Sequence, residues 1–122
     1  MKVLIVDDSF EMRREIREFV SDLADEIYEC SGGVETMAKY AVHRPDWVLM
    51  DIVMEQMDGL ETTRRLVTIY PEAKIVIVTS YNDEYLRDAA HAAGASGYVM
   101  KDNLLELRRM LQSPHSGGQD RG

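Results

Sequence analysis

Four short apolar runs in this sequence end in polar side chains that could do chemistry at a common site. The run VLIV at residues 3–6 is followed by two carboxylates, Asp7 and Asp8, and WVLM at residues 47–50 is followed by Asp51. The run IVIV ends in two hydroxyl side chains and GYVM ends in an ammonium group; these residues are Thr79, Ser80 and Lys101. Because open parallel sheets bind ligands at the carboxyl ends of their strands, we expect these side chains to lie close together.

The three carboxylates of this set predict a metal site. Neighbouring carboxylates repel one another unless a cation lies between them or protons neutralise some of them. Oxygen ligands favour Mg²⁺, which binds one or two carboxylates and often a phosphate oxygen. Asp7 and Asp8 are therefore predicted to hold Mg²⁺, and Asp51 is left as a nucleophile for phosphorus. Lys101 would supply a second positive charge beside the incoming phosphoryl group.

Each part of this pattern also has an ordinary structural explanation. Paired aspartates after a strand often cap a helix, and Asp51 alone could end a strand. Thr79 and Ser80 could belong to a simple turn, and a single lysine is usually solvated. Their coincidence at four strand ends favours a phosphoryl site.

The elements that must position these residues alternate between short β-branched runs and longer segments of helical period. This alternation predicts an α/β fold in which a parallel sheet is flanked by crossover helices. Strands are predicted at residues 2–6, 26–30, 47–50, 74–79 and 97–100. The first, third and fourth are nearly continuous apolar runs and should be central, whereas the second mixes charged and apolar residues and suits an edge. The short fifth strand is the candidate for the other edge.

Five helices are expected between and after these strands. The first follows a Ser9 cap, and the fourth covers residues 83–93 and stops at Gly94. The third begins after Gly59 and ends at Pro71, and the fifth is capped by Asp102 or Asn103. The second runs from about residue 34 to Pro45, and its expected buried residues are Val34, Met37, Ala38 and Ala41.

Size and charge limit the classes of protein that fit. The 122 residues suffice for one domain. A formal net charge of −8 works against direct binding to nucleic acid, and no apolar run is long enough for a membrane span. No secretory signal is visible, because Asp7 and Asp8 interrupt the first apolar run, so we expect a cytoplasmic protein. The single cysteine, Cys30, is expected to be a buried, inert thiol.

The chain resembles the receiver domain of two-component response regulators over roughly residues 1–112. The resemblance is carried by VLIVDDS at the start, WVLMDIVMEQMDGLE around Asp51, IVIVTSY at the fourth strand and GASGYVMKD at the fifth. It implies a doubly wound, flavodoxin-like sheet of five parallel strands in the order 2-1-3-4-5, with five flanking helices. Residues 113–122 contain no apolar side chain and are expected to form a disordered tail or the start of a linker.

The resemblance also implies a role for each site residue. Asp51 would be the phosphoacceptor, with Asp7 and Asp8 as the acidic pair that holds Mg²⁺. The backbone carbonyl of Val53 would contact the metal, and the ammonium group of Lys101 would contact the phosphate. The hydroxyl of Thr79 would act as a switch by turning toward the phosphoryl group, and the ring of Tyr98 would change its rotamer with it. Val53 and Tyr81 occupy the two variable positions that influence how fast the phosphoryl group is lost.

Two residues depart from the pattern of the family. Glu55 stands where a proline usually follows the methionine corresponding to Met54, so the loop after Asp51 should be less stiff and more acidic. Asp102 replaces the proline that often follows the lysine in a cis peptide. A cis bond before a residue other than proline costs about 2.5–4 kcal/mol, so a trans bond is expected.

The predicted function is a phosphorylatable receiver that accepts a phosphoryl group from a sensor histidine kinase or phosphotransfer protein. The receiver is expected to act as a switch that assists its own phosphorylation and dephosphorylation, and not as an enzyme in its own right. Its surface formed by the fourth helix, fifth strand and fifth helix would bind an output partner, act on a fused output domain, or form a phosphorylation-linked homodimer. The chain could stand alone or be the N-terminal receiver of a DNA-binding transcriptional regulator.

Two other classes of function are alternatives to the receiver. An Mg²⁺-dependent phosphatase that forms an aspartyl phosphate would need a substrate cap and often a D-x-D motif, and neither is visible. An interaction module with decayed switch chemistry would not be expected to retain every one of the site residues.

Overall fold

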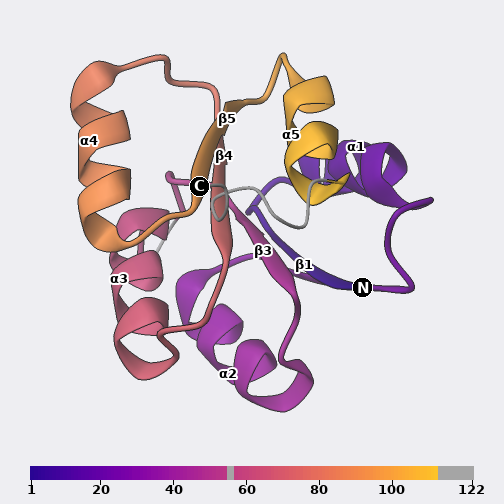
Figure 1. Ribbon diagram of the computed structural model, residues 1–122, viewed down its shortest axis with the longest axis horizontal. Coiled ribbons are helices and arrows are strands. Elements are labelled where there is room, and N and C mark those ends of the chain that lie inside the picture. Colours follow the sequence, from indigo (N-terminus) through magenta and orange to yellow (C-terminus); the bar gives the residue numbers. More distant parts are fainter. Residues whose placement is uncertain (55–56, 113–122) are drawn as a thin grey trace, which may run out of the picture.

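Five strands and five helices alternate along the described part of the chain, residues 1–54 and 57–112, in a computed structural model (Figure 1). The strands are Lys2–Val6 (β1), Glu26–Cys30 (β2), Trp47–Met50 (β3), Ile75–Thr79 (β4) and Gly97–Met100 (β5). The helices are Phe10–Val20 (α1), Gly33–His43 (α2), Gly59–Ile69 (α3), Glu84–Ala93 (α4) and Leu104–Gln112 (α5). All strand pairs are parallel, and the order β2-β1-β3-β4-β5 confirms the predicted sheet. Glu55 and the predicted tail at 113–122 lie outside the described residues.

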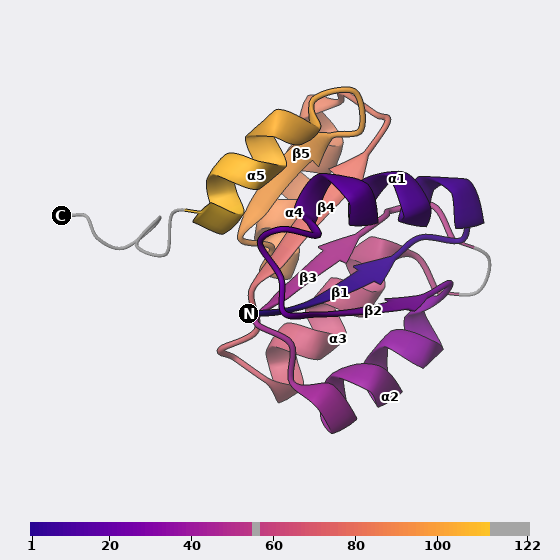
Figure 2. The same ribbon diagram turned by 90° about the vertical axis from the view of Figure 1, so that its right-hand side faces the viewer.

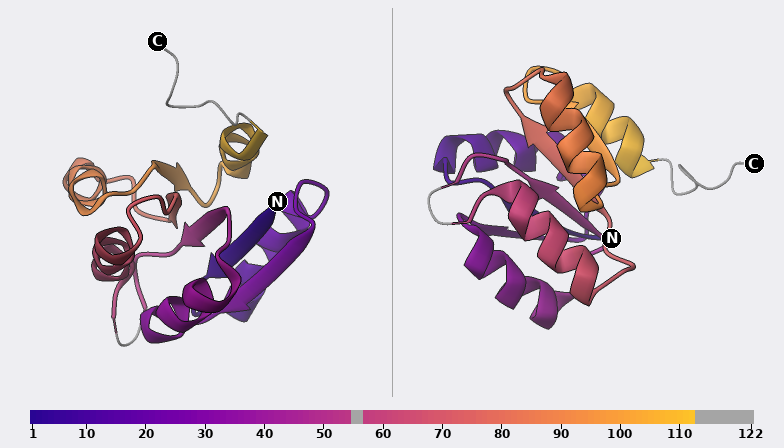
Figure 3. Two further views of the ribbon diagram at one scale, coloured as in Figure 1. Left: turned by 60° about the horizontal axis from the view of Figure 1, so that its bottom comes forward. Right: turned by 90° about the vertical axis from the view of Figure 1, so that its left-hand side faces the viewer.

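The sheet separates two hydrophobic layers, because successive residues of a strand point to opposite faces. Helices α1 and α5 cover one face, and α2, α3 and α4 cover the other (Figure 2, Figure 3). On β1, Val3 and Ile5 pack in the layer that contains α1 and α5, whereas Leu4 and Val6 pack in the opposite layer. Burial on both faces explains why the central strands are continuous apolar runs.

The edge strands also lie where the sequence predicts them. Strand β2 is partly exposed along most of its length, and β5 pairs only with β4 within the described sheet. Among the helices, α1 buries Ile16 and Val20, and α5 buries Leu104 and Leu107, in one hydrophobic layer. Across the described residues each helix is too short or too polar to span a lipid bilayer.

The predicted buried face of α2 is wrong. Val34 is 60% exposed and Ala38 and Ala41 are also exposed, although Met37 packs partly against the core. The face that meets the sheet instead carries Gly33, Thr36 and Tyr40, which share one side of the helix.

The contacts of the Thr36 hydroxyl explain why a polar residue is tolerated on the face of α2 that meets the sheet. The hydroxyl of Thr36 donates to the carbonyl of Gly32 at 2.8 Å and lies 3.3 Å from the sulfur of Cys30. A threonine whose hydroxyl is satisfied by its own helix can replace an aliphatic residue in a core. Cys30 is buried as predicted, and burial raises the pKa of its thiol.

Two helix ends agree with the sequence-based predictions. The side chain of Ser9 accepts a hydrogen bond from the amide of Met12 and caps α1 as expected. Asp83, which was expected to be the first residue of the fourth helix, instead precedes α4 and caps it by accepting from the amides of Tyr85 and Leu86. Gly94 ends α4 with a φ of 107°, a conformation that glycine adopts without steric cost. Asp58 was not among the predicted caps; its carboxylate caps α3 by accepting from the amide of Glu61 at 2.8 Å.

Two threonines on α3 give a matched test of how this core treats polar groups. Thr62 and Thr63 are both fully buried, but only the hydroxyl of Thr62 has a partner, the carbonyl of Asp58 at 2.9 Å; that of Thr63 has none within the described residues. We predict that Thr63→Val stabilises the protein by about 1 kcal/mol, because it removes an unpaired buried hydroxyl without changing the shape. Thr62→Val should destabilise it by about 1 kcal/mol. Urea unfolding measures both; equal effects of the two substitutions would contradict the prediction.

Candidate functional site

The pairing of β1 with β3 places two aspartates side by side at the carboxyl end of the sheet. The backbone amide of Asp51 donates to the carbonyl of Val6 at 2.9 Å, and that of Asp7 donates to the carbonyl of Cys30 at 3.1 Å. Both bonds extend a strand ladder by one residue, so the register of the buried strands fixes where the two carboxylates emerge. Neither can leave the site without a change in strand pairing.

Three carboxylates meet at this point. Asp7, Asp8 and Asp51 each offer one carboxylate oxygen, and these oxygens all lie within 4.8 Å of one another. Asp7 is 1% exposed and Asp51 6% exposed, whereas Asp8 lies at the surface. The sequence therefore correctly predicted that these three residues come together.

Lys101 completes the cluster from the end of β5. Its ammonium nitrogen lies 3.0 Å from Oδ2 of Asp7 and 3.4 Å from Oδ1 of Asp51. The backbone amide of Lys101 donates to the carbonyl of Thr79 at 2.8 Å, which continues the β4–β5 ladder up to the site. The peptide bond from Lys101 to Asp102 is trans, as predicted. One ammonium group thus faces three carboxylates, and the site is short of positive charge.

This shortage appears in the protonation of the buried groups. Burial, together with the neighbouring charge of Asp7, raises the pKa of Asp51 to about 6, although Lys101 acts in the opposite direction. Burial alone would lower the pKa of Lys101, but the carboxylates of Asp7 and Asp51 outweigh burial and raise it. Lys101 is therefore a permanent cation of the site, and Asp51 is held in its ionised form only weakly.

The acidic cluster fits a hard divalent cation. Oδ1 of Asp7 accepts a hydrogen bond from the amide of Ser9 at 2.8 Å. Its Oδ2 is buried and, apart from the ion pair with Lys101, has no hydrogen-bond partner in the described chain. A buried oxygen of this kind, next to two further carboxylates, has the chemistry that Mg²⁺ prefers, since all the donors are oxygens.

Gly59, the first residue of α3, allows the N-terminal end of this helix to approach Asp51 closely. A Cβ atom at this position would lie 1.9 Å from the carbonyl oxygen of Asp51, and the amide of Gly59 donates to the carbonyl of Ile52 at 2.8 Å. A larger side chain would push the phosphoacceptor candidate out of place. From the sequence, Gly59 was predicted only as the boundary of the third helix. A glycine at the first helical position is the signal that could have indicated this close approach.

Thr79, Tyr81 and Tyr98 form a chain of contacts beside the acidic cluster. Thr79 is fully buried at the end of β4, and its hydroxyl accepts a hydrogen bond from the amide of Tyr81 at 3.2 Å. The hydroxyl of Tyr98 donates to the carbonyl of Tyr81 at 2.7 Å, and the guanidinium of Arg87 lies 4.6 Å from the centre of the Tyr98 ring. The side chains of Tyr81 and Val53 are about half exposed.

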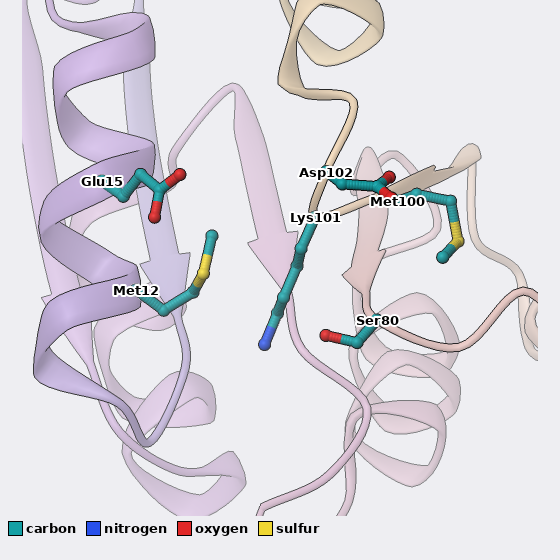
Figure 4. Close-up of a pocket in the computed structure, with 6 residues that line it drawn as sticks. All are labelled: Met12, Glu15, Ser80, Met100, Lys101 and Asp102. Atoms are coloured by element: carbon teal, nitrogen blue, oxygen red, sulfur yellow. The ribbon is translucent and has the colours of Figure 1, made fainter.

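An open cavity of about 360 Å³ lies next to the cluster (Figure 4). It runs between α1 and the end of β5, and Lys101 is the residue that belongs to both the cavity and the cluster. The other lining residues are Met12, Glu15, Ser80, Met100 and Asp102. The site is therefore accessible from solvent on the side of Lys101.

Comparisons with known proteins agree with this arrangement. The family model described as "Response regulator receiver domain" matches residues 3–112. The chemotaxis protein CheY of Halobacterium salinarum is 39% identical over 100 residues, which cover 82% of this chain and 83% of that protein. The transcriptional regulatory protein YhcZ of Bacillus subtilis is 32% identical over 119 residues, which cover 96% of this chain and 56% of that protein. The chain thus spans most of the length of one relative and about half of the other.

The fold is shared with solved structures. The response regulator domain of Thermotoga maritima CheB superposes with a TM-score of 0.85 at 21% identity, and 98% of each chain is covered. This likeness supports the sheet order and the placement of the helices.

We predict that Asp51→Asn stabilises the metal-free protein at about pH 8 and has little effect at about pH 4. Because the pKa of Asp51 is raised, the folded state binds its proton more tightly than the unfolded state, and stability falls as pH rises from about 4 to about 6. The raised pKa of Asp51 corresponds to a change of about 3 kcal/mol in the free energy of unfolding without solvent screening, and of about 1–2 kcal/mol with it. Urea unfolding in the presence of EDTA measures the difference.

Asp88→Asn is the matched control for this prediction. Asp88 is an exposed carboxylate on α4, outside the site, and its replacement should leave the pH profile of the wild type unchanged. Parallel stability curves for the wild type and Asp51→Asn over the whole pH range would contradict the prediction.

Proposed function

Because the chain belongs to the response regulator receiver domain family, we propose that it accepts a phosphoryl group on Asp51 from a histidine kinase or a phosphotransfer protein. The observation that carries the proposal is the meeting of Asp7, Asp8 and Asp51 with Lys101 at one accessible end of the sheet. The cluster has one ammonium group for three carboxylates, so a divalent cation and a phosphoryl group together would complete it. Receiver domains are regulatory phosphoacceptors, and this chain would act as a switch.

The transfer step uses Asp51 as the nucleophile. One carboxylate oxygen of Asp51 attacks phosphorus, the P–N bond of the donor phosphohistidine breaks, and the imidazole nitrogen keeps the electron pair and takes up a proton from water. Mg²⁺ held by the carboxylates of Asp7, Asp8 and Asp51 and by the backbone carbonyl of Val53 would neutralise charge on the phosphoryl oxygens. Lys101, already 3.4 Å from Asp51, would bind another of these oxygens.

The same site offers a route from phosphorylation to a change in surface. The hydroxyl of Thr79 accepts from Tyr81 and keeps its own hydrogen for donation, so it can turn to a phosphoryl oxygen on Asp51. This movement would free space into which Tyr98 can pack, at the cost of its bond to Tyr81 and its contact with Arg87. The surface of α4, β5 and α5 would then change between two arrangements.

The lifetime of the phosphoryl group is proposed to depend on Val53 and Tyr81. Both side chains are about half exposed, and they lie on the loops that follow Asp51 and Thr79. Bulk at these positions would control the access of water to the acyl phosphate on Asp51. The exposed ring of Tyr81 is the larger of the two shields.

The output is proposed to be a protein partner or a fused output domain in the cytoplasm. The relative YhcZ is named a transcriptional regulatory protein, and CheY is named a chemotaxis protein, so the matches include both a longer regulator and a protein of similar length. A net charge of −8 argues against direct contact of this chain with nucleic acid in either case.

Acetyl phosphate with Mg²⁺ tests the proposed phosphoacceptor. We predict a single phosphoryl adduct in the intact mass of the wild type and of Asp88→Asn, and none in Asp51→Asn, because Asp51 supplies the only attacking oxygen. Removal of Mg²⁺ with EDTA should abolish the adduct. An adduct that persists in Asp51→Asn would overturn the assignment, and steady turnover of a small phosphorylated substrate would support a phosphatase instead.

Beryllofluoride tests a phosphorylation-linked homodimer. Tyr85 on α4 is 78% exposed and Leu105 on α5 is 59% exposed, and these apolar groups could pair across two copies once the surface changes. We predict that beryllofluoride with Mg²⁺ raises the molecular mass in solution from monomer to dimer, as measured by light scattering. Identical monomer masses with and without beryllofluoride would count against the dimer.

A further inference from the structure

The backbone of Asp7 receives a hydrogen bond that the proposed chemistry does not use. Nη1 of Arg13, on α1, donates to the carbonyl oxygen of Asp7 at 2.7 Å. This carbonyl belongs to the peptide unit that joins Asp7 to Asp8, and a peptide unit is planar. The direction of the carbonyl therefore sets the direction in which the chain enters Asp8.

The guanidinium of Arg13 is itself held in place. Its Nε donates to Oε1 of Glu29 on β2 at 2.9 Å, and the Arg13 side chain is only 16% exposed. Two acceptors at the planar fork of a guanidinium fix its orientation, which a single contact would not do. Arg13 thus connects α1, the edge strand β2 and the loop that carries the acidic pair.

Asp8 depends on this backbone support more than Asp7 does. The carboxylate of Asp7 is tied down by the amide of Ser9 and by Lys101. Asp8 is exposed, and its side chain makes no hydrogen bond or ion pair with the residues described for this chain. Its placement within 4.8 Å of the other carboxylates therefore follows from the conformation of the backbone at Asp7 and Asp8.

We propose that Arg13 is a positioning residue that holds the Asp7–Asp8 peptide so that both carboxylates reach one divalent cation, with Glu29 as its anchor. The inference rests on the proposed function, because it concerns the same Mg²⁺ site. It assigns a positive role in cation binding to a residue that is itself a cation.

The direction in which replacement of Arg13 changes the affinity for Mg²⁺ distinguishes a positioning role from a purely electrostatic one. Arg13 carries a positive charge, which repels Mg²⁺, so loss of this charge alone would strengthen Mg²⁺ binding. Loss of positioning would weaken it, since groups that orient metal ligands commonly change affinity by about 10–100-fold. The two effects act in opposite directions on the same measurement.

Arg17 provides a matched control from the same helix. Its Nε donates to Oε2 of Glu29 at 2.7 Å and its Nη2 donates to the carbonyl of Ile27 at 3.4 Å. It shares the anchor of Arg13 and the same charge, but its hydrogen bonds do not include Asp7. Its replacement therefore removes one charge and one ion pair with Glu29 while the bond to the carbonyl of Asp7 remains.

Calorimetric titration of the full chain with MgCl₂ tests the inference. We expect Arg13→Met to weaken Mg²⁺ binding by about tenfold. Arg17→Met should stay within about twofold of the wild type, and Glu29→Gln, which leaves the charge of Arg13 in place but loosens its anchor, should weaken binding by about threefold. Circular dichroism and urea unfolding in EDTA establish that each variant is folded.

Arg13→Lys keeps the test decisive if Arg13→Met does not fold. Lysine retains the charge but lacks the planar fork that bonds Asp7 and Glu29 together, so weakening by about threefold or more supports the inference and wild-type affinity overturns it. Unchanged or tighter binding by Arg13→Met, with normal binding by the wild type, overturns the inference and leaves the proposed function intact. A wild type that binds no Mg²⁺ overturns both.

Discussion

Repulsion between two buried carboxylates that share one ammonium group is the constraint on which this site depends. Asp7 and Asp51 follow adjacent strands, and the ladder between β1 and β3 holds their backbones together. The apolar side chains of these strands are buried on both faces of the sheet, so the register cannot slip to relieve the repulsion. The hydrophobic core thus maintains an unfavourable electrostatic arrangement that a cation and an anion can relieve.

The surroundings of the cluster hold its backbone more than its side chains. Ser9 caps α1 and its amide donates to Asp7, Gly59 lets α3 approach the carbonyl of Asp51, and Arg13 donates to the carbonyl of Asp7. Apart from the ion pair of Asp7 with Lys101, these contacts leave Oδ2 of Asp7 and the carboxylate of Asp8 free of hydrogen bonds from the described protein, so both can accept a ligand. A site that must take up and release its ligand needs this combination of a fixed backbone and open oxygens.

The sequence predicted the sheet and the acidic cluster well because both follow from simple rules. Continuous apolar runs mark strands buried on two faces, and the polar residue after each run marks the carboxyl end. The order of the strands came from the family resemblance, since periodicity does not determine which strands are neighbours. The roles of Thr79, Tyr98 and Val53 came from the same source and stay predictions.

The wrong and missing predictions, for the buried face of α2 and for the contacts of Arg13 and Gly59, share a physical cause. The buried face of α2 was wrong because Thr36 satisfies its hydroxyl within the helix, and hydropathy alone treats threonine as a surface residue. Arg13 has no role among the sequence-based predictions, because its partner is a main-chain carbonyl, which no side-chain pattern reveals. The approach of Gly59 to Asp51 is likewise a contact with backbone. Patterns of side chains identify what a site contains, and they say little about how its backbone is held.

The backbone and the side chain of Tyr81 make separate contributions to the structure. Its amide and carbonyl join Thr79 to Tyr98, whereas its ring stands at the surface of the loop. Any residue other than proline has the same amide and carbonyl, so the hydrogen bonds that join Thr79 to Tyr98 do not depend on the side chain at this position. Under the proposed function, exchange of the ring would change the duration of a signal and leave its transmission intact.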